Sequence, residues 1–184
     1  MMQPSVSDSC QIVMDKFALH ELVLRYCRAC DRRDYRLLRS LYHDDAIDDH
    51  GKLFCGSAQE YVEWLPSMLA RYEATVHSIT NALFAVDGDL AEGEIYTVAY
   101  HRTHPPEPRE IIIGGRYLDR YERRKGEWRF LRRWLAFDWV DERPFNAKTW
   151  ARSAAASNPG RPDADDPSYR YLSLLGRSDT VSSA

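Results

Sequence analysis

The sequence predicts an α+β fold in which a curved antiparallel sheet holds helices in its concave side. Two observations carry this prediction. Up to about residue 70 the apolar residues recur at helical spacing, and after Glu73 the spacing changes to period two. The period-two segments are separated by short turn sequences, which is typical of consecutive antiparallel strands.

The first predicted helix contains an apolar stripe that runs from Leu19 to Cys30 at the spacing of one helical face. Cys27 and Cys30 are spaced like a redox or metal dithiol. They lie at the end of the helix, whereas redox dithiols usually lie at a helix N-terminus, and no second Cys or His pair completes a zinc site. We therefore predict that both are small core residues, buried and reduced.

Two further helices follow. Asp34 is placed as the N-cap of the second helix, and a short strand is expected around Ile47. Ser57 and Glu60 have the spacing of a capping box at the start of the third helix, which contains Pro66, where a kink is expected.

The second half of the chain contains four predicted strands. Turn sequences at 87–89 and 125–126 join them, and the proline-rich segment 103–110 is a loop because proline cannot feed a sheet ladder. Gly114-Gly115 predicts a bulge or bend within a strand. The four strands are expected at residues 75–86, 90–102, 111–124 and 127–140.

Composition limits the classes of function. The 184 residues are 44% hydrophobic and 29% charged, with a net charge of -3 and no large basic block, which argues against nucleic-acid binding. The sequence contains no run of about 18 apolar residues, so no membrane span is predicted. The first ten residues lack the basic start and apolar segment of a signal peptide, so we expect a cytoplasmic protein.

The motifs around "DRRD", "LYHDDA" and "GRYLDRYERRKGEW" resemble the SnoaL-like branch of the nuclear transport factor 2-like superfamily. The resemblance covers roughly residues 15–140, with an N-terminal extension at 1–14 and a C-terminal arm at 141–184. It implies a cone-shaped, cystatin-like sheet around the N-terminal helices and a chemistry that needs no cofactor and no metal. The arm is expected to contain a short docking element with Tyr169, Tyr171, Leu172 and Leu175.

By this resemblance, Asp31 and His77 match the catalytic pair of the dehydrating and dehydrochlorinating members. The histidine is the general base there, and the aspartate orients its imidazole. The chemistry suits the residues, because a neutral histidine can accept a proton at physiological pH and a carboxylate stabilises the imidazolium that forms. The alternative is a satisfied core histidine and a solvated aspartate at the end of the first helix.

Three more residues are candidates for substrate binding. Tyr26 could donate a proton or hydrogen bond to a leaving group, or be a core tyrosine on the apolar stripe. Arg133 matches an arginine that points into the cone in related enzymes and could bind an anion there, or it could form a salt bridge on the outer face. Asn81 is expected on the same strand face as His77.

The other histidines were assigned no catalytic role. His101 and His104 are predicted at the surface or rim, near a strand end. His43 and His50 flank several aspartates, which invites a metal site, but a polar connection between elements is the preferred interpretation, since the family chemistry needs no metal.

We therefore predict a dehydratase-like lyase that acts on a small hydrophobic cyclic molecule in an enclosed pocket. Two alternatives stay open: a non-catalytic small subunit of a ring-hydroxylating dioxygenase, and a small-molecule binding module. Large side chains alternate along the predicted strands, and in the last one Trp128, Phe130 and Trp134 are expected on one face and Leu131 on the other, with Arg133. We therefore also expect a homo-oligomer, a trimer or dimer, joined through the sheet.

Overall fold

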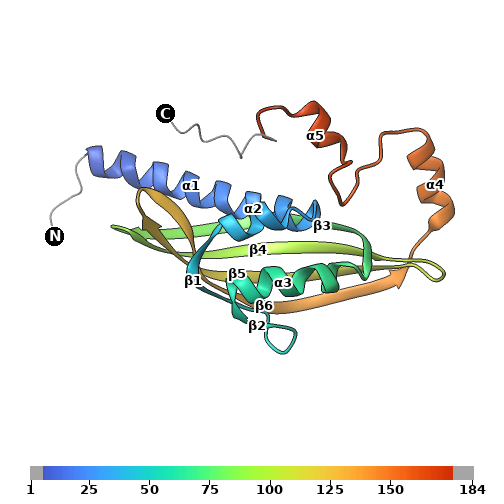
Figure 1. Ribbon diagram of the computed structural model, residues 1–184, viewed down its shortest axis with the longest axis horizontal. Helices are drawn as coiled ribbons and strands as arrows, with labels where there is room; N and C mark the ends of the chain where they lie inside the picture. Colours follow the sequence, from blue (N-terminus) through green and yellow to red (C-terminus); the bar gives the residue numbers. More distant parts are fainter. Residues whose placement is uncertain (1–5, 176–184) are drawn as a thin grey trace.

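The computed structural model describes residues 6–175, so the two ends of the chain, including the last residues of the predicted arm, lie outside the described part. Three helices precede the four long strands, with two short strands before the third helix, and the helices lie on one side of a long sheet (Figure 1). Within the described residues, no helix is long and apolar enough to cross a membrane. The three helices are α1 (Val6–Asp31), α2 (Tyr35–Ser40) and α3 (Ala58–Leu69).

Local sequence signals define these helices. The stripe predicted on α1 is buried, including Cys27 and Cys30. The backbone N–H of Leu37 donates to Asp34 Oδ1 at 2.9 Å, which confirms the N-cap of α2. The capping box of α3 is also present, and that helix continues past Pro66 to Leu69.

The sheet has six strands in the order β2-β1-β6-β5-β4-β3, curved and unclosed, so the predicted α+β class is confirmed. All neighbouring strands are antiparallel except β1 and β6, which run parallel and make the sheet mixed. The strands are β1 (Tyr42–Asp49), β2 (Cys55–Ser57), β3 (Tyr72–Asp87), β4 (Leu90–Thr103), β5 (Arg109–Arg124) and β6 (Glu127–Pro144).

Three of the sheet's register shifts bear on the predicted positions of side chains. The bulge predicted at Gly114-Gly115 is present, and a Cβ on Gly114 would lie 2.0 Å from the ring of Trp139. A second shift, between Ile79 and Ala82 of β3, sets two residues against one on β4. A third lies where β5 passes from Arg120 to Tyr121, opposite β6. The last two were not predicted.

The β3 bulge corrects the prediction for Asn81. Without the bulge, Asn81 would share a face with His77. With it, Ala82 and Phe84 continue the inner face, and Asn81 is exposed on the side of Tyr96. Asn81 therefore does not line the interior.

The shift between Arg120 and Tyr121 of β5 leaves Leu131 as an extra residue in β6, and this bulge has a similar effect. The alternation predicted for this strand placed Leu131 beside Arg133 and placed Trp128, Phe130 and Trp134 together. In the structure Phe130 is fully buried, whereas Trp134 is 46% exposed. One extra residue in the strand has therefore moved the side chains that precede it to the opposite face.

The C-terminal arm contains α4 (Ala147–Ala155), which was not predicted, and α5 (Pro167–Tyr171). In Figure 1, α4 lies beyond one end of the sheet and α5 returns above the end of α1. Asp166, the N-cap of α5, lies 3.2 Å from Arg32 Nε, and Tyr169 stacks on the guanidinium of Arg28. Of the predicted docking residues, Tyr169 makes this contact while Tyr171, Leu172 and Leu175 are exposed.

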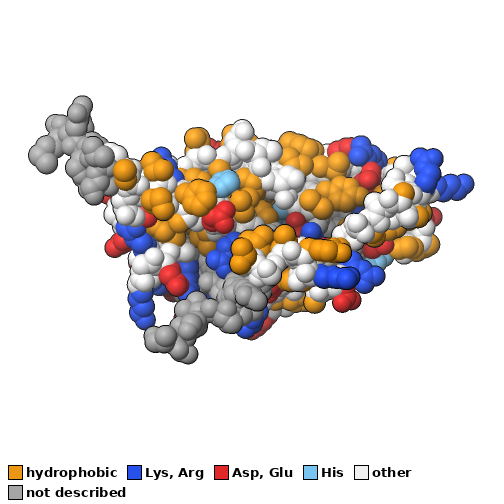
Figure 2. All heavy atoms as spheres, turned by 90° about the horizontal axis from the view of Figure 1, so that it is seen from above, with side chains coloured by type: hydrophobic (Ala, Val, Ile, Leu, Met, Phe, Trp, Pro, Cys, Tyr) orange, Lys and Arg blue, Asp and Glu red, His pale blue; other side chains and the backbone are white. Residues whose placement is uncertain are grey.

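The outer side of α1 remains partly apolar. Figure 2, which looks from above Figure 1, shows hydrophobic side chains mixed with charged ones on this side of the molecule. Val13, Met14 and Phe17 are each more than half exposed, at 66%, 63% and 62%. The inner side of α1 is the opposite case, since its stripe packs against the sheet and forms the core.

Candidate active site

The end of α1 meets the inner face of β3 at two side chains. Asp31 is the last residue of α1, and His77 lies within β3. His77 Nδ1 and Asp31 Oδ1 are 2.7 Å apart, and the backbone N–H of His77 donates to Asp31 Oδ2 at 2.9 Å. One carboxylate therefore holds both the imidazole and the backbone of His77.

This arrangement selects one form of the imidazole. An ionised carboxylate can only accept, so Nδ1 must carry the proton when His77 is neutral. The lone pair then lies on Nε2, which makes no hydrogen bond within the described residues. The side chains of His77 and Asp31 are each only 10% exposed, so the pair is largely shielded from water.

A second histidine lies beside this pair. His101 of β4 is 5% exposed, and its ring centroid lies 5.9 Å from that of His77 in an edge-on arrangement. Burial, and secondly the neighbouring His77, lower the pKa of His101 to about 4, so it is neutral at physiological pH. The prediction that His101 lies at the rim is wrong, whereas His104 is exposed as expected.

The sequence held a signal for His101 that the prediction did not use. Its position alternates with Ile95, Thr97 and Ala99, all buried residues of β4. Parity along the strand therefore places it inside. The prediction relied instead on its closeness to the proline-rich loop.

Arg133 lies in the interior, fully buried on β6. It donates from Nε and Nη2 to the two oxygens of Asp119 on β5, at 2.8 and 2.7 Å. Its guanidinium also lies within 4.3 Å of three ring centroids, those of Tyr26, Tyr117 and Phe130. Burial opposes its charge, but Asp119 holds the pKa of Arg133 well above its usual range.

Arg133 thus combines features of both sequence interpretations. It points inward, and it also forms a salt bridge between strands. Nη1 alone is buried without a hydrogen-bond partner in the described structure. Asp119 was missed, although its alternation with Tyr117 and Tyr121 places it on the same inner face.

Tyr26 is a core residue in the structure. Its hydroxyl lies 2.7 Å from that of Tyr61, and its ring packs edge-on against Tyr117 and Phe130. Burial raises the pKa of Tyr26 well above its usual value. Its hydroxyl is therefore protonated and shared with Tyr61.

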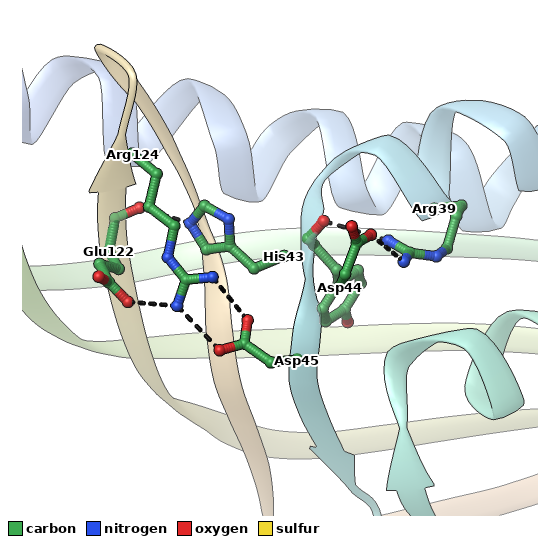
Figure 3. A network of polar contacts seen from close by, with 7 residues as sticks. Arg39, His43, Asp44, Asp45, Glu122 and Arg124 are labelled. Carbon is green, nitrogen blue, oxygen red and sulfur yellow. Dashed lines mark hydrogen bonds and ion pairs between the residues drawn. The ribbon is translucent and has the colours of Figure 1, made fainter.

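A separate polar cluster joins β1 to α2 and to the end of β5 (Figure 3). Arg124 binds Asp45 at 2.7 and 3.0 Å and Glu122 at 2.6 Å, while Arg39 binds Asp44 at 2.5 Å. His43 lies 2.8 Å from the backbone oxygen of Glu122. Each of these carboxylates is bound by an arginine, and within residues 6–175 no group of three or more His, Cys, Asp or Glu side chains is arranged to hold a metal ion.

Two thiols of α1 lie in the core, in the helical turn that precedes Asp31. Cys27 and Cys30 are free and buried, as predicted. Burial raises the pKa of Cys27 to about 12 and that of Cys30 well above its usual value. Neither is a thiolate at physiological pH, so neither is a nucleophile.

A cavity of about 340 Å³ lies between the β3–β4 edge and the arm, and neither His77 nor Asp31 lines it. Thr75, two residues before His77, and Arg32, which follows Asp31, both line it. Its other wall includes Tyr100 and Trp150. The cavity is therefore both cationic and aromatic, and large enough for a small cyclic molecule.

Comparison with known proteins identifies a family and several structures of similar fold. The sequence model of the SnoaL-like domain matches residues 11–134. Among curated proteins, none matches the chain by sequence.

Solved structures resemble the chain in fold at low sequence identity. A protein assigned as a scytalone dehydratase from Novosphingobium aromaticivorans is 20% identical, with a TM-score of 0.68, covering 76% of this chain and 94% of that one. The hexachlorocyclohexane dehydrochlorinase LinA-type3 from Novosphingobium barchaimii is 19% identical, with a TM-score of 0.67 and coverage of 76% and 95%. The Kfla4162 protein from Kribbella flavida is 21% identical, with a TM-score of 0.66 and coverage of 71% and 95%.

Proposed function

We propose that this chain, which belongs to the SnoaL-like family, is a dehydratase-type lyase in which His77 takes a proton from a small hydrophobic cyclic substrate. The observation that carries the proposal is the 2.7 Å contact between His77 Nδ1 and Asp31, which leaves Nε2 as the proton acceptor. Dehydratase and dehydrochlorinase relatives of the same fold support the reaction class.

The reaction balances with these two side chains alone. Nε2 accepts a proton from a carbon next to the leaving group, and the C–H electron pair forms the new double bond as the C–O bond breaks. Asp31 stabilises the imidazolium that results. The imidazolium then returns its proton to the departing hydroxide, so water leaves and His77 is neutral again.

Other interior groups act on charge that develops in the substrate. Nη1 of Arg133 offers a donor without a partner in the described structure, although Asp119 offsets the charge of the guanidinium. The Tyr26 hydroxyl can donate to a leaving oxygen only if Tyr61 is the donor, and Tyr26 the acceptor, in their shared hydrogen bond. Arg133 and Tyr26 are therefore secondary binding candidates beside His77 and Asp31.

The proposal is tested with a panel of cyclic and bicyclic alcohols and ketones. Loss of water is followed by mass spectrometry, and proton abstraction by deuterium uptake from D₂O. We expect at least one compound to react and His77→Gln to lower its rate by about 100-fold or more.

The matched control is His104→Gln, which changes an exposed histidine and should leave the rate unchanged. Circular dichroism confirms that each variant is folded. A compound that binds and stabilises the wild type but gives neither product nor exchange would favour a binding module instead.

We also propose that the outer face of the sheet joins copies of the chain into a homo-oligomer. Leu83, Trp134 and Trp139 are 68%, 46% and 48% exposed on this face. Contiguous apolar patches of this kind usually mark interfaces. Light scattering that gives the monomer mass of 21.4 kDa at micromolar concentration would refute this.

A further inference from the structure

Arg33 lies two residues after Asp31, in the connection between α1 and α2, and its backbone is left-handed. Its φ is 56°, a region that favours glycine and is unusual for a long side chain. Glycine is the common residue at such a position after a helix. The presence of an arginine at this position indicates a role for its side chain.

The side chain bridges α1 and β3 through neutral groups. Nη1 donates to the backbone oxygen of Cys30 at 2.7 Å and to Thr75 Oγ1 at 2.8 Å. Nη2 is buried and has no hydrogen-bond partner in the described structure. Burial lowers the pKa of Arg33, which shows that its charge is poorly compensated.

Three other shielded arginines have a carboxylate partner, whereas Arg28 bonds to Ser168 and stacks on Tyr169 of the arm. Arg133 binds Asp119, Arg102 binds Glu73, and Arg32 contacts Asp166. Arg33 forms no ion pair within residues 6–175, and both oxygens of nearby Asp31 are already bonded to His77. A shielded cation without a counter-ion favours the binding of an anionic group.

Thr75 connects Arg33 to the groups of the candidate active site. Thr75, which binds Arg33, is two residues before His77 and pairs with His101 across the β3–β4 ladder. Nδ1 of His101 is likewise buried without a hydrogen-bond partner in the described structure. Thr75 also lines the cavity between the sheet and the arm. Unpaired buried polar groups that gather in one place need a ligand or water to satisfy them.

We propose that Arg33 binds a carboxylate on the substrate, so that the substrate is a cyclic carboxylic acid. The acidic group would accept from Nη2, on the side of β3 where Arg33 binds Thr75 and where the His77 side chain lies. This inference rests on the proposed function, since it assigns the substrate class of the same site. It also explains why the left-handed position holds an arginine.

The alternative is that Arg33 only clamps the end of α1 to β3. The two roles separate in Arg33→Gly, which removes the guanidinium but relaxes the backbone. Arg33→Gln is a second variant that stays long and polar without the charge. Thr75→Val is the matched control, because it removes one of the clamp's hydrogen bonds and keeps the charge.

The test is isothermal titration calorimetry with cyclohexanecarboxylate, benzoate and 2-naphthoate, each compared with its neutral amide. We expect the wild type to bind at least one carboxylate about tenfold to a hundredfold more tightly than the amide, the weight of one charge-assisted hydrogen bond. Arg33→Gly and Arg33→Gln should lose this preference without a lower melting temperature in the glycine variant. Thr75→Val should keep it.

His77→Gln separates this inference from the proposed reaction. It should keep the carboxylate preference, because binding needs no base, even if no turnover is ever found. The inference is overturned if no carboxylate binds the wild type, if a folded Arg33→Gln variant keeps the preference, or if Thr75→Val loses it as fully as Arg33→Gln does.

Discussion

Asp31 and Asp119 are both buried carboxylates on the inner side of the sheet, yet their surroundings differ. Asp119 gives both oxygens to Arg133 and also accepts from the hydroxyl of Tyr121 at 2.7 Å. Asp31 gives both oxygens to His77, whose second ring nitrogen stays without a partner in the described structure. Asp119 therefore neutralises the charge of Arg133 in an aromatic core, whereas Asp31 orients a histidine that can still accept a proton.

The difference separates stability from chemistry within one fold. A permanently charged arginine paired in the core mainly holds strands together, because its charge is already compensated and Nη1 alone is left to donate. A histidine paired with a carboxylate can change charge at physiological pH, so the same kind of contact prepares a reaction. Each of the following changes tests one side of this contrast.

Breaking the core pair should have the largest effect on stability. Asp119→Asn leaves the buried charge of Arg133 uncompensated, so we expect a loss of about 3–5 kcal/mol in the free energy of unfolding, measured by urea denaturation. Asp31→Asn is the matched change at the other site and should cost only about 1–2 kcal/mol, because it leaves a neutral partner behind. Equal losses for the two variants would contradict the division of roles.

The neutral state of His101 should give stability a pH dependence. Its pKa is about 4 in the folded protein and about 6.5 in the unfolded chain. Between these values the unfolded chain binds the extra proton, so the free energy of unfolding should fall as the pH is lowered from 6.5 to 4, by up to about 3 kcal/mol.

His101→Phe removes this titration and keeps a ring against Tyr72. The difference in unfolding free energy between the variant and the wild type should therefore change across that pH range. A constant difference between pH 7 and pH 4 would show that His101 is accessible to protons in the folded state.

Much of the fold could be predicted from local signals. The caps at Asp34 and Ser57, the apolar stripe of α1 and the glycine pair in β5 each act through neighbouring residues, so the sequence alone contains the information. Asp31 and His77 were expected together through the family resemblance, and the structure brings them within hydrogen-bond distance.

What the sequence did not reveal depends on pairing between strands. A bulge adds one residue relative to the neighbouring strand, so its position cannot be read from one strand alone. That is why Asn81 and Leu131 were assigned to the wrong faces. The pairing of Arg133 with Asp119 could not be predicted for the same reason, since it depends on the register of β5 and β6. The parallel pairing of β1 with β6 joins segments far apart in sequence.

The smallest effect concerns the thiols of α1. With pKa values raised by burial, Cys27 and Cys30 should react with a thiol reagent only when the protein opens, whereas exposed Cys10 and Cys55 should react at once. Native labelling followed by peptide mass spectrometry should find the latter two modified first. Rapid labelling of Cys30 would instead show that the end of α1, beside Asp31, is open to solvent.

The central claim is that Asp31 holds His77 with its lone pair on Nε2. Nitrogen-15 NMR of the imidazole side chains, with the His77 signal assigned from the His77→Gln variant, measures this directly when the histidine is neutral. We expect Nδ1 to be protonated and Nε2 bare in the wild type, and the bias to weaken in Asp31→Asn. A neutral His77 with its proton on Nε2 would contradict the account, because that form could not accept a proton from a substrate at that nitrogen.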